Sequence, residues 1–252
     1  MTAAPIRSGS ARRTRADRAR QVADVLRQQV VRGAFADGAL PDERLLTLEF
    51  GASRNTIREA LDVLREEGLI DRLPGVGTVV RNEKYAHGID QLRGLAETLR
   101  GHGEVTNEVR AAGPVRPPAT VARALRVADG ESVVYVERLR SLGGLPLSLD
   151  LTYLVREIGE PLLAEDLAGT DIFTLIERES GQGLGTAQLQ LEAVNADAHS
   201  AALLAVPKGA ALLVMERLTQ LADGRPIDLE YIRFRGDRLT MSAELLRRPG
   251  DA

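Results

Sequence analysis

The sequence predicts an α+β protein of two domains, with an N-terminal winged helix-turn-helix and a C-terminal mixed, mainly antiparallel sheet that carries helices. Residues 40–80 read as two short helices, a tight turn and a hairpin with glycines at its tip. The second half contains a strand-turn-strand pattern that occurs twice. With 252 residues the chain is also long enough for two hydrophobic cores, since domains commonly span about 100 to 200 residues.

The first segment is basic. The first twenty residues carry six arginines and one aspartate. We expect residues 1–15, with Arg12, Arg13 and Arg15, to form a disordered arm. Such an arm could attract phosphate without sequence preference, or it could be a solubilising tail.

The DNA-binding domain is predicted over residues 16–81. Residues 16–32 form a helix candidate with apolar residues on one face, and Gly33 can end it. Asp42 can cap a second, shorter helix, and Gly51 allows the sharp exit that a helix-turn-helix needs. Three helices before the hairpin are enough to hold a recognition helix in place.

The third helix candidate carries the clearest functional signal. Ser53 can cap it, and its buried face follows the i, i+3, i+4, i+7 spacing of an amphipathic helix. The first two turns of the opposite face can therefore meet phosphates and base edges. The residues expected there are Ser53, Arg54, Asn55, Thr56 and Arg58. The alternative is that these arginines are ordinary solvated side chains, but the preceding helix and the following hairpin favour DNA binding.

The hairpin follows directly. Leu69–Leu73 and Thr78–Val80 are strand candidates joined by a turn that contains Gly75 and Gly77. Past this hairpin the chain becomes polar without periodic apolar residues, and we assign residues 82–89 to a linker.

Composition limits the compartment and the partners. The chain has no cysteine, no apolar run near the roughly 20 residues of a membrane span, and no signal-peptide core, so we expect a cytoplasmic protein with no membrane partner. The formal net charge is −3, yet residues 1–85 are net +3 and residues 86–252 are net −6. This asymmetry fits a protein of which only one part meets phosphate.

The second domain is predicted over residues 90–247 and is built on the repeat. The stretches that begin at Val127 and Val206 align with an offset of about 80, so that Arg138 matches Arg217 and Asp150 matches Glu230. Each copy reads as a strand, a glycine-proline turn and a returning strand. We expect the two hairpins to pair in one antiparallel sheet, with helices between them over residues 161–204.

Arg138 and Arg140 are the leading candidates for an effector site. They alternate along one strand candidate, so both point to the same face, where two guanidinium groups repel unless an anion or carboxylates compensate. Either an anionic effector binds there, or both arginines pair with Glu137, Glu216 or Glu230. Further candidates that could accept hydrogen bonds or contact the effector are Asp150, Tyr153, Glu230 and Arg235.

Catalysis, metal binding and cofactors have no support in the sequence. The three histidines, His87, His102 and His199, are scattered, and the chain has neither a serine-histidine motif nor a glycine-rich phosphate loop.

Residues 16–81 resemble the DNA-binding domain of GntR-type bacterial transcription regulators. The resemblance rests on residues at the family's fixed spacings, which are Pro41, Glu43, Arg44, Ser53, Arg54, Thr56, Arg58, Ala60, Leu61, Gly75, Gly77 and Thr78. It implies that Arg44, Arg54 and Arg58 contact the operator and that the wing glycines approach the minor groove. Two positions differ: Asp42 replaces the usual capping serine, and Val76 stands at the wing tip, where many members have a basic residue.

Residues 90–247 resemble the effector domain of the HutC subfamily, the UTRA domain, whose fold is similar to chorismate lyase. The resemblance rests on the segments ERLRSLGGLPLSLDLTYL, DIFTLIERESG and GRPIDLEYIRFRGDRL. It implies a small ligand, often a sugar phosphate or an organic acid, bound in a pocket on the sheet.

The combined prediction is a transcription regulator, most simply a repressor, that binds palindromic double-stranded operator DNA as a homodimer and responds to a small effector. Two alternatives remain at this stage. One is an enzyme with a chorismate-lyase-like domain, and the other is an architectural DNA binder whose second domain only dimerises.

Overall fold

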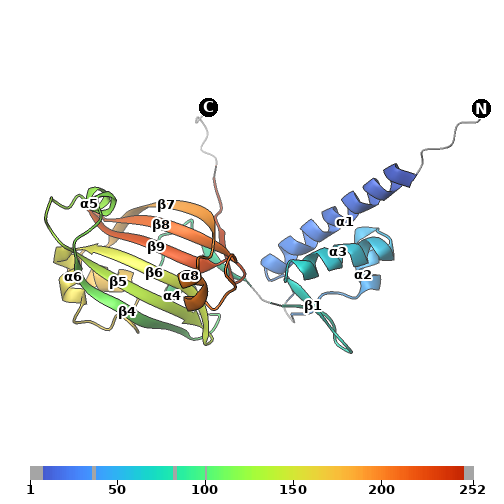
Figure 1. Cartoon of the computed structure of the whole chain (residues 1–252), viewed down its shortest axis with the longest axis horizontal. Helices are drawn as coiled ribbons and strands as arrows, with labels where there is room; N and C mark the ends of the chain where they lie inside the picture. Colours follow the sequence, from blue (N-terminus) through green and yellow to red (C-terminus); the bar gives the residue numbers. More distant parts are fainter. Residues whose placement is uncertain (1–7, 36–37, 82–83, 100, 247–252) are drawn as a thin grey trace, which may run out of the picture. The chain divides into compact units, whose positions relative to one another are not determined.

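The structure is a computed structural model that describes residues 8–35, 38–81, 84–99 and 101–246. The chain divides into two compact units, residues 1–84 and 85–252 (Figure 1). Each unit combines helices with antiparallel strands, so the predicted α+β class is confirmed. No helix in the described part of the chain is both long and apolar enough to span a membrane.

The first unit is a winged helix-turn-helix. Its elements are α1 (Ser8–Val31), α2 (Glu43–Phe50), α3 (Arg54–Glu66), β1 (Ile70–Leu73) and β2 (Gly77–Val80). One apolar core joins the helices and includes the fully buried Leu26, Leu46 and Ile57. The two strands form the predicted hairpin, with Ile70 opposite Val80 and Leu73 opposite Gly77.

Helix α1 begins earlier than expected. We predicted a disordered arm over residues 1–15, but residues 8–15 are helical. The physical reason is composition, since residues 10–32 contain neither glycine nor proline and are rich in alanine and arginine, which favour helix. Residues 1–7 lie outside the described part of the chain.

The second unit contains one large sheet and a small one. Its helices are α4 (Leu95–Leu99), α5 (Ala119–Leu125), α6 (Arg156–Leu162), α7 (Ile172–Ser180) and α8 (Ala198–Leu203). The large sheet consists of β4 (Val105–Val115), β5 (Val133–Leu142), β6 (Leu145–Val155), β7 (Leu184–Asn195), β8 (Ala211–Leu221) and β9 (Pro226–Arg235). The small sheet pairs β3 (Tyr85–Gly88) with β10 (Leu239–Ser242).

The strand order β4-β5-β6-β9-β8-β7 confirms that the repeated hairpins share one antiparallel sheet. The hairpins β5-β6 and β8-β9 meet in the middle, where β6 pairs with β9. Each copy is longer than the sequence indicated, because β4 and α5 precede the first hairpin as β7 and α8 precede the second. Gly130 and Gly209 occupy matching turns with φ of 88° and 84°, a backbone region that glycine adopts without strain.

The two faces of the large sheet are covered differently. On what we call the inner face, α6 and α7 pack against β5 and β6 at one end, and α4 packs against the hairpin residues Leu142 and Leu147 at the other. On the outer face, α5 covers one end and α8 the other. The inner face is therefore covered by helices and also by two loops, one between β3 and α4 and one between α6 and α7.

The linker prediction was wrong for part of its length. Residues 85–88, assigned to a linker over residues 82–89, form β3, which pairs in parallel with β10 from Leu239 onward. The pairing depends on a strand about 150 residues away, so no local periodicity could indicate it. Residues 82–83 lie outside the described part of the chain.

Candidate nucleic-acid interface and buried polar cluster

Capping hydrogen bonds between neighbouring residues fix the first turn of α3. The Ser53 side chain accepts from the Thr56 amide at 3.2 Å, and the two hydroxyls lie 2.8 Å apart. Thr56 is buried, so its side chain belongs to the cap and not to the surface. Arg54 and Asn55 are exposed in the first turn and Arg58 in the second. These three side chains, unlike that of Thr56, lie where DNA could reach them.

Helix α2 is held by equally local contacts. Asp42 Oδ1 accepts from the Leu45 amide at 2.7 Å, so the aspartate caps this helix as predicted. Gly51 ends the helix in the left-handed conformation. Arg44, in the first turn, is exposed. The turn at Gly51 brings α2 against α3, which places a further arginine beside the recognition helix.

The wing has the glycines but not a basic tip. Gly75 and Gly77 adopt φ of 78° and 116°, which L-residues rarely tolerate. Val76 between them is 66% exposed. A backbone without side chains at both glycine positions can approach a groove closely. Together, the exposed arginines of α2 and α3 and the narrow wing form a surface suited to phosphates and base edges.

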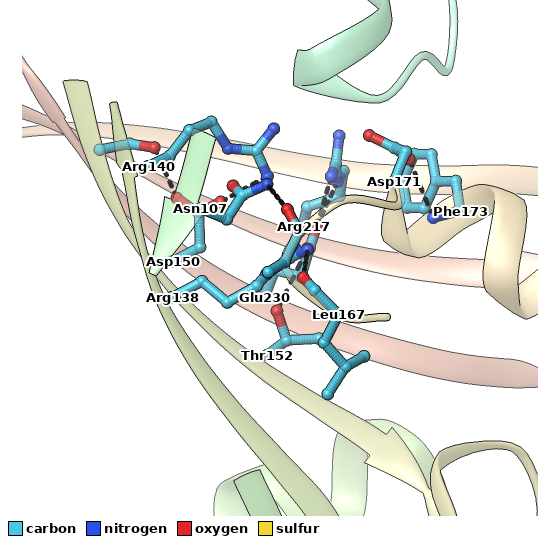
Figure 2. A network of polar contacts seen from close by, with 12 residues as sticks. Asn107, Arg138, Arg140, Asp150, Thr152, Leu167, Asp171, Phe173, Arg217 and Glu230 are labelled. Carbon is cyan, nitrogen blue, oxygen red and sulfur yellow. Dashed lines mark hydrogen bonds and ion pairs between the residues drawn. The ribbon is translucent and has the colours of Figure 1, made fainter. Parts of the chain in front are cut away.

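The inner face of the large sheet holds the second candidate site (Figure 2). Arg138 and Arg140 both project from β5 onto this face, as predicted, and both are almost completely buried. Arg140 Nη2 donates to Asp150 Oδ2 at 2.9 Å, and the Ser148 hydroxyl donates to the other Asp150 oxygen at 2.6 Å. Arg138, by contrast, makes a single hydrogen-bond contact within the described part of the chain, from Nη1 to the Leu167 carbonyl at 3.5 Å.

In the second repeat copy, Arg217 makes more hydrogen bonds than Arg138 makes in the first. Arg217 Nε donates to Glu230 Oε2 at 2.9 Å, and its Nη2 contacts the same oxygen. The Thr152 hydroxyl donates to the other Glu230 oxygen at 3.3 Å. The Arg217 guanidinium also lies 4.4 Å from the centre of the Phe173 ring. Arg217 was visible in the sequence as the repeat mate of Arg138, and that was the signal that could have identified it.

The two copies therefore differ in how many of their guanidinium nitrogens have a hydrogen-bond partner. Four buried guanidinium nitrogens, Nε and Nη2 of Arg138 and Nε and Nη1 of Arg140, have no hydrogen-bond partner among the described residues. The same holds for both carboxyl oxygens of Asp228. A buried donor on a charged group costs at least about 1 to 3 kcal/mol when it is unpaired. The cluster therefore contains unpaired guanidinium donors and an unpaired carboxyl group among the described residues.

Two titratable groups beside this cluster were not predicted. Burial raises the pKa of Asp228, and the neighbouring Glu230 carboxylate raises it further. His87 of β3 is buried, with Nδ1 at 3.2 Å from the Thr98 hydroxyl. Burial, followed by the charges of Arg217 and Arg140, lowers the pKa of His87 to about 4. The ring is therefore neutral at pH 7 and adds no positive charge to the cluster.

The remaining two effector-site candidates lie on the other side of the sheet. Tyr153 belongs to a row on the outer face, 5.1 Å from the Tyr135 ring and 6.4 Å from the Tyr231 ring. Arg235 pairs with Asp237 at 2.7 Å and donates to the Leu204 carbonyl at 3.2 Å. The structure brings Arg138, Arg140, Asp150 and Glu230 together, but it does not bring Tyr153 or Arg235 to them. Strand alternation separates the two groups.

Two cavities open on the inner side of the sheet. One, of about 270 Å³, is lined by Arg217 and His87, by the loop after β3 and by the start of β7. The other, of about 580 Å³, lies between α4 and α7, with Gly94, Asp171 and Phe173 in its wall. Arg217 lines the smaller cavity, whereas Arg138 and Arg140 line neither of the two.

Known families match both units. The family described as bacterial regulatory proteins, gntR family, matches residues 18–80, and the UTRA domain family matches residues 100–240. These are families of transcription regulators and not of enzymes.

Individual proteins similar to this chain include two that are named as repressors. The HTH-type transcriptional repressor NagR of Bacillus subtilis is 30% identical over 224 residues, which cover 87% of this chain and 91% of that protein. The mannosyl-D-glycerate transport/metabolism system repressor MngR of Escherichia coli is 34% identical over 54% of this chain and 57% of its own length. The crystal structure of PhnF from Mycobacterium smegmatis, 23% identical, covers 90% of this chain and 100% of that chain with a TM-score of 0.66, which shows a shared fold.

Replacing His87 with glutamine should change how stability depends on pH. The folded-state pKa of about 4 lies below the usual 6.5, so the unfolded chain takes up the proton first and the wild type loses stability as pH falls from about 6.5 to 4. The loss should approach about 3 kcal/mol and be absent from the variant. Urea unfolding followed by tyrosine fluorescence isolates this unit, because all four tyrosines lie in residues 85–252 and the chain has no tryptophan. Equal pH slopes in both proteins would contradict the burial of a neutral histidine.

Proposed function

The chain belongs to the GntR family of bacterial regulatory proteins and carries a UTRA domain, and from this premise we propose how it recognises DNA and what controls it. As a member of this family it is a DNA-binding transcription regulator with an effector domain. We propose a repressor, because two of its relatives carry that name. Within it, residues 16–81 read the operator, and residues 90–247 bind the effector and hold two copies together.

DNA recognition is assigned to the front of α3, to α2 and to the wing. Arg54, Asn55 and Arg58 read or position the major groove, Arg44 adds a backbone contact, and Gly75 and Gly77 let the wing approach the minor groove. Ser53 and Thr56 hold the first turn of α3 and present its amides. The observation that supports this assignment is the capped helix whose buried face points into the core and whose arginines are exposed.

A homodimer fits this mode of binding. A two-fold palindromic operator presents two equivalent half-sites about one helical turn apart, and a two-fold protein matches both at once. The place of action is the cytoplasm, where bacterial operator DNA lies. An effector would then act by favouring one arrangement of the two DNA-binding units over another.

The effector is an anion of the sugar phosphate or organic acid class. Four unpartnered guanidinium nitrogens of Arg138 and Arg140 support this choice, since a phosphate or carboxylate accepts several such donors at once. Asp150 and Glu230 hold the arginines in place and can accept from hydroxyl groups of the same ligand. Tyr153 and Arg235 lie on the outer face, so they do not belong to this proposed site.

Arg54→Ala should weaken operator binding by about 1 to 3 kcal/mol, because it removes an exposed guanidinium from the first turn of the recognition helix. The measurement is a gel-shift titration with a duplex selected from a random pool by the wild-type protein. Arg93→Ala is the control, since Arg93 is an exposed arginine of the second unit whose ion pair to Glu97 spans 4.0 Å. Unchanged binding in both Arg54→Ala and Arg58→Ala would rule out the proposed recognition surface.

Arg138→Met should abolish the response to the effector while DNA affinity stays intact. Methionine keeps much of the buried volume, and the Arg140–Asp150 pair is left whole, so the fold should survive. A panel of sugar phosphates and organic acids, screened by thermal shift, identifies compounds that stabilise the wild type, and each should fail to stabilise the variant. Arg178→Met, at an exposed arginine of α7 that pairs with Glu165, is the matched control. If no anion stabilises the wild type, the architectural alternative gains support.

A further inference from the structure

The hollow between the recognition helix and the wing has a volume of about 320 Å³. It lies between α3 and β1, and its charged lining residues are Glu43, Arg58, Asp62, Arg65, Asp71 and Arg72. Three basic and three acidic side chains would cancel if they paired one to one. Their actual pairing decides what the hollow can bind.

The pairs are not one to one. Arg65 pairs with Asp62, one turn back along α3. Asp71 pairs with Arg81, outside the hollow, at 3.4 Å. Of the acidic residues that the structure describes, Glu43 is the one that pairs with both Arg58 and Arg72.

Glu43 stands where three elements of the first unit meet. Its Oε2 accepts from Arg58 Nε of α3 at 2.8 Å, and its Oε1 lies 3.9 Å from Arg72 Nη1 of β1. The carboxylate is 24% exposed, whereas the two arginine side chains are 59% and 67% exposed. Among the described residues, Arg58 hydrogen-bonds to Glu43 through Nε, and Arg72 reaches the same carboxylate only through the 3.9 Å ion pair of Nη1. Two guanidinium groups are thus gathered by one carboxylate, with most of their donors still available.

A DNA phosphate is the anion that fits this arrangement. When α3 enters the major groove and the wing approaches the adjacent minor groove, the sugar-phosphate strand that separates the grooves has to pass between them. Arg58 and Arg72 lie on the two sides of that passage. Guanidinium groups bind phosphate oxygens through several parallel donors, which suits two arginines that converge.

We propose that Arg72 of the wing strand, together with Arg58, binds one phosphate of the operator backbone, and that Glu43 is the positioning residue that sets both guanidinium groups for this contact. The inference rests on the proposed DNA-binding function and adds a contact to it. It also supplies the cation that the wing lacks at Val76. The positive charge of this wing lies in its first strand and not at its tip.

Arg72→Gln should weaken binding to the selected duplex about tenfold and should lower the slope of log Kd against log salt by about one, as expected for one lost phosphate contact. Arg65→Gln is the matched control, because it removes an arginine from the same hollow that is already paired with Asp62. Its affinity should stay within about twofold of the wild type. An unchanged slope for Arg72→Gln, or an equal loss for Arg65→Gln, would overturn the proposal.

The role of Glu43 can be tested by the direction in which DNA affinity changes when this residue is replaced. A carboxylate that only repels DNA would raise affinity when it is removed, whereas a positioning carboxylate lowers affinity when it is removed. We expect Glu43→Ala to weaken binding severalfold, and we expect Glu43→Gln, which keeps an acceptor for Arg58, to restore it. Tighter binding by Glu43→Ala would refute the positioning role. If Arg54→Ala weakens binding while Arg72→Gln does not, this inference alone fails and the proposed function stands.

Discussion

The second unit depends on three guanidinium groups buried on one sheet face, only two of which form an ion pair among the described residues. Arg217 pairs with Glu230 and Arg140 pairs with Asp150, whereas Arg138 forms no ion pair with a described residue. Buried ion pairs seldom add net stability, and breaking one of them is expensive. The unpaired donors of Arg138 and Arg140 are buried at the centre of the domain, so they lower its stability by the cost of removing them from water.

The internal repeat explains how this imbalance arises. In the second copy, the arginine and the acid that face each other across the hairpin bond directly, as Arg217 does with Glu230. In the first copy Arg138 faces Asp150 in the same register, yet Asp150 bonds to Arg140 instead. Arg140 corresponds to Thr219 in the second copy, so one extra arginine diverts the acid. The two copies thus share the same strand register, and the presence of Arg140 in place of a threonine leaves Arg138 without an ion pair among the described residues.

The first strand of the second unit borders this cluster. Strand β3 starts at Tyr85, directly after the first unit ends at Lys84, and its His87 lines the same cavity as Arg217. A ligand that contacts this wall would act on the first element of the second unit. The free-energy change that such a ligand can impose on DNA binding equals the difference between its binding free energies for the two arrangements of the protein.

Features that depend on neighbouring residues could be predicted, and features that depend on distant ones could not. Caps at Asp42 and Ser53 and the left-handed turn at Gly51 are local, so the helix-turn-helix was predictable in detail. Strand β3 needs its distant partner β10, so the local sequence indicates only a polar linker there. Strand alternation alone could have separated Arg235 from Glu230, since the two are five residues apart on one strand and must face opposite sides.

Reciprocal titration of ligand and operator tests most directly whether the inner-face cluster controls DNA binding. An anion that stabilises the wild type through Arg138 should change operator affinity by some factor, and operator DNA should change the affinity for that anion by the same factor. Calorimetric titration of the anion into the free protein and into the protein-operator complex measures this factor for the anion, and gel-shift titration of the operator with and without the anion measures it for DNA. Equal factors different from one are the predicted result. An anion that binds at Arg138 with the same affinity in both titrations would contradict the account.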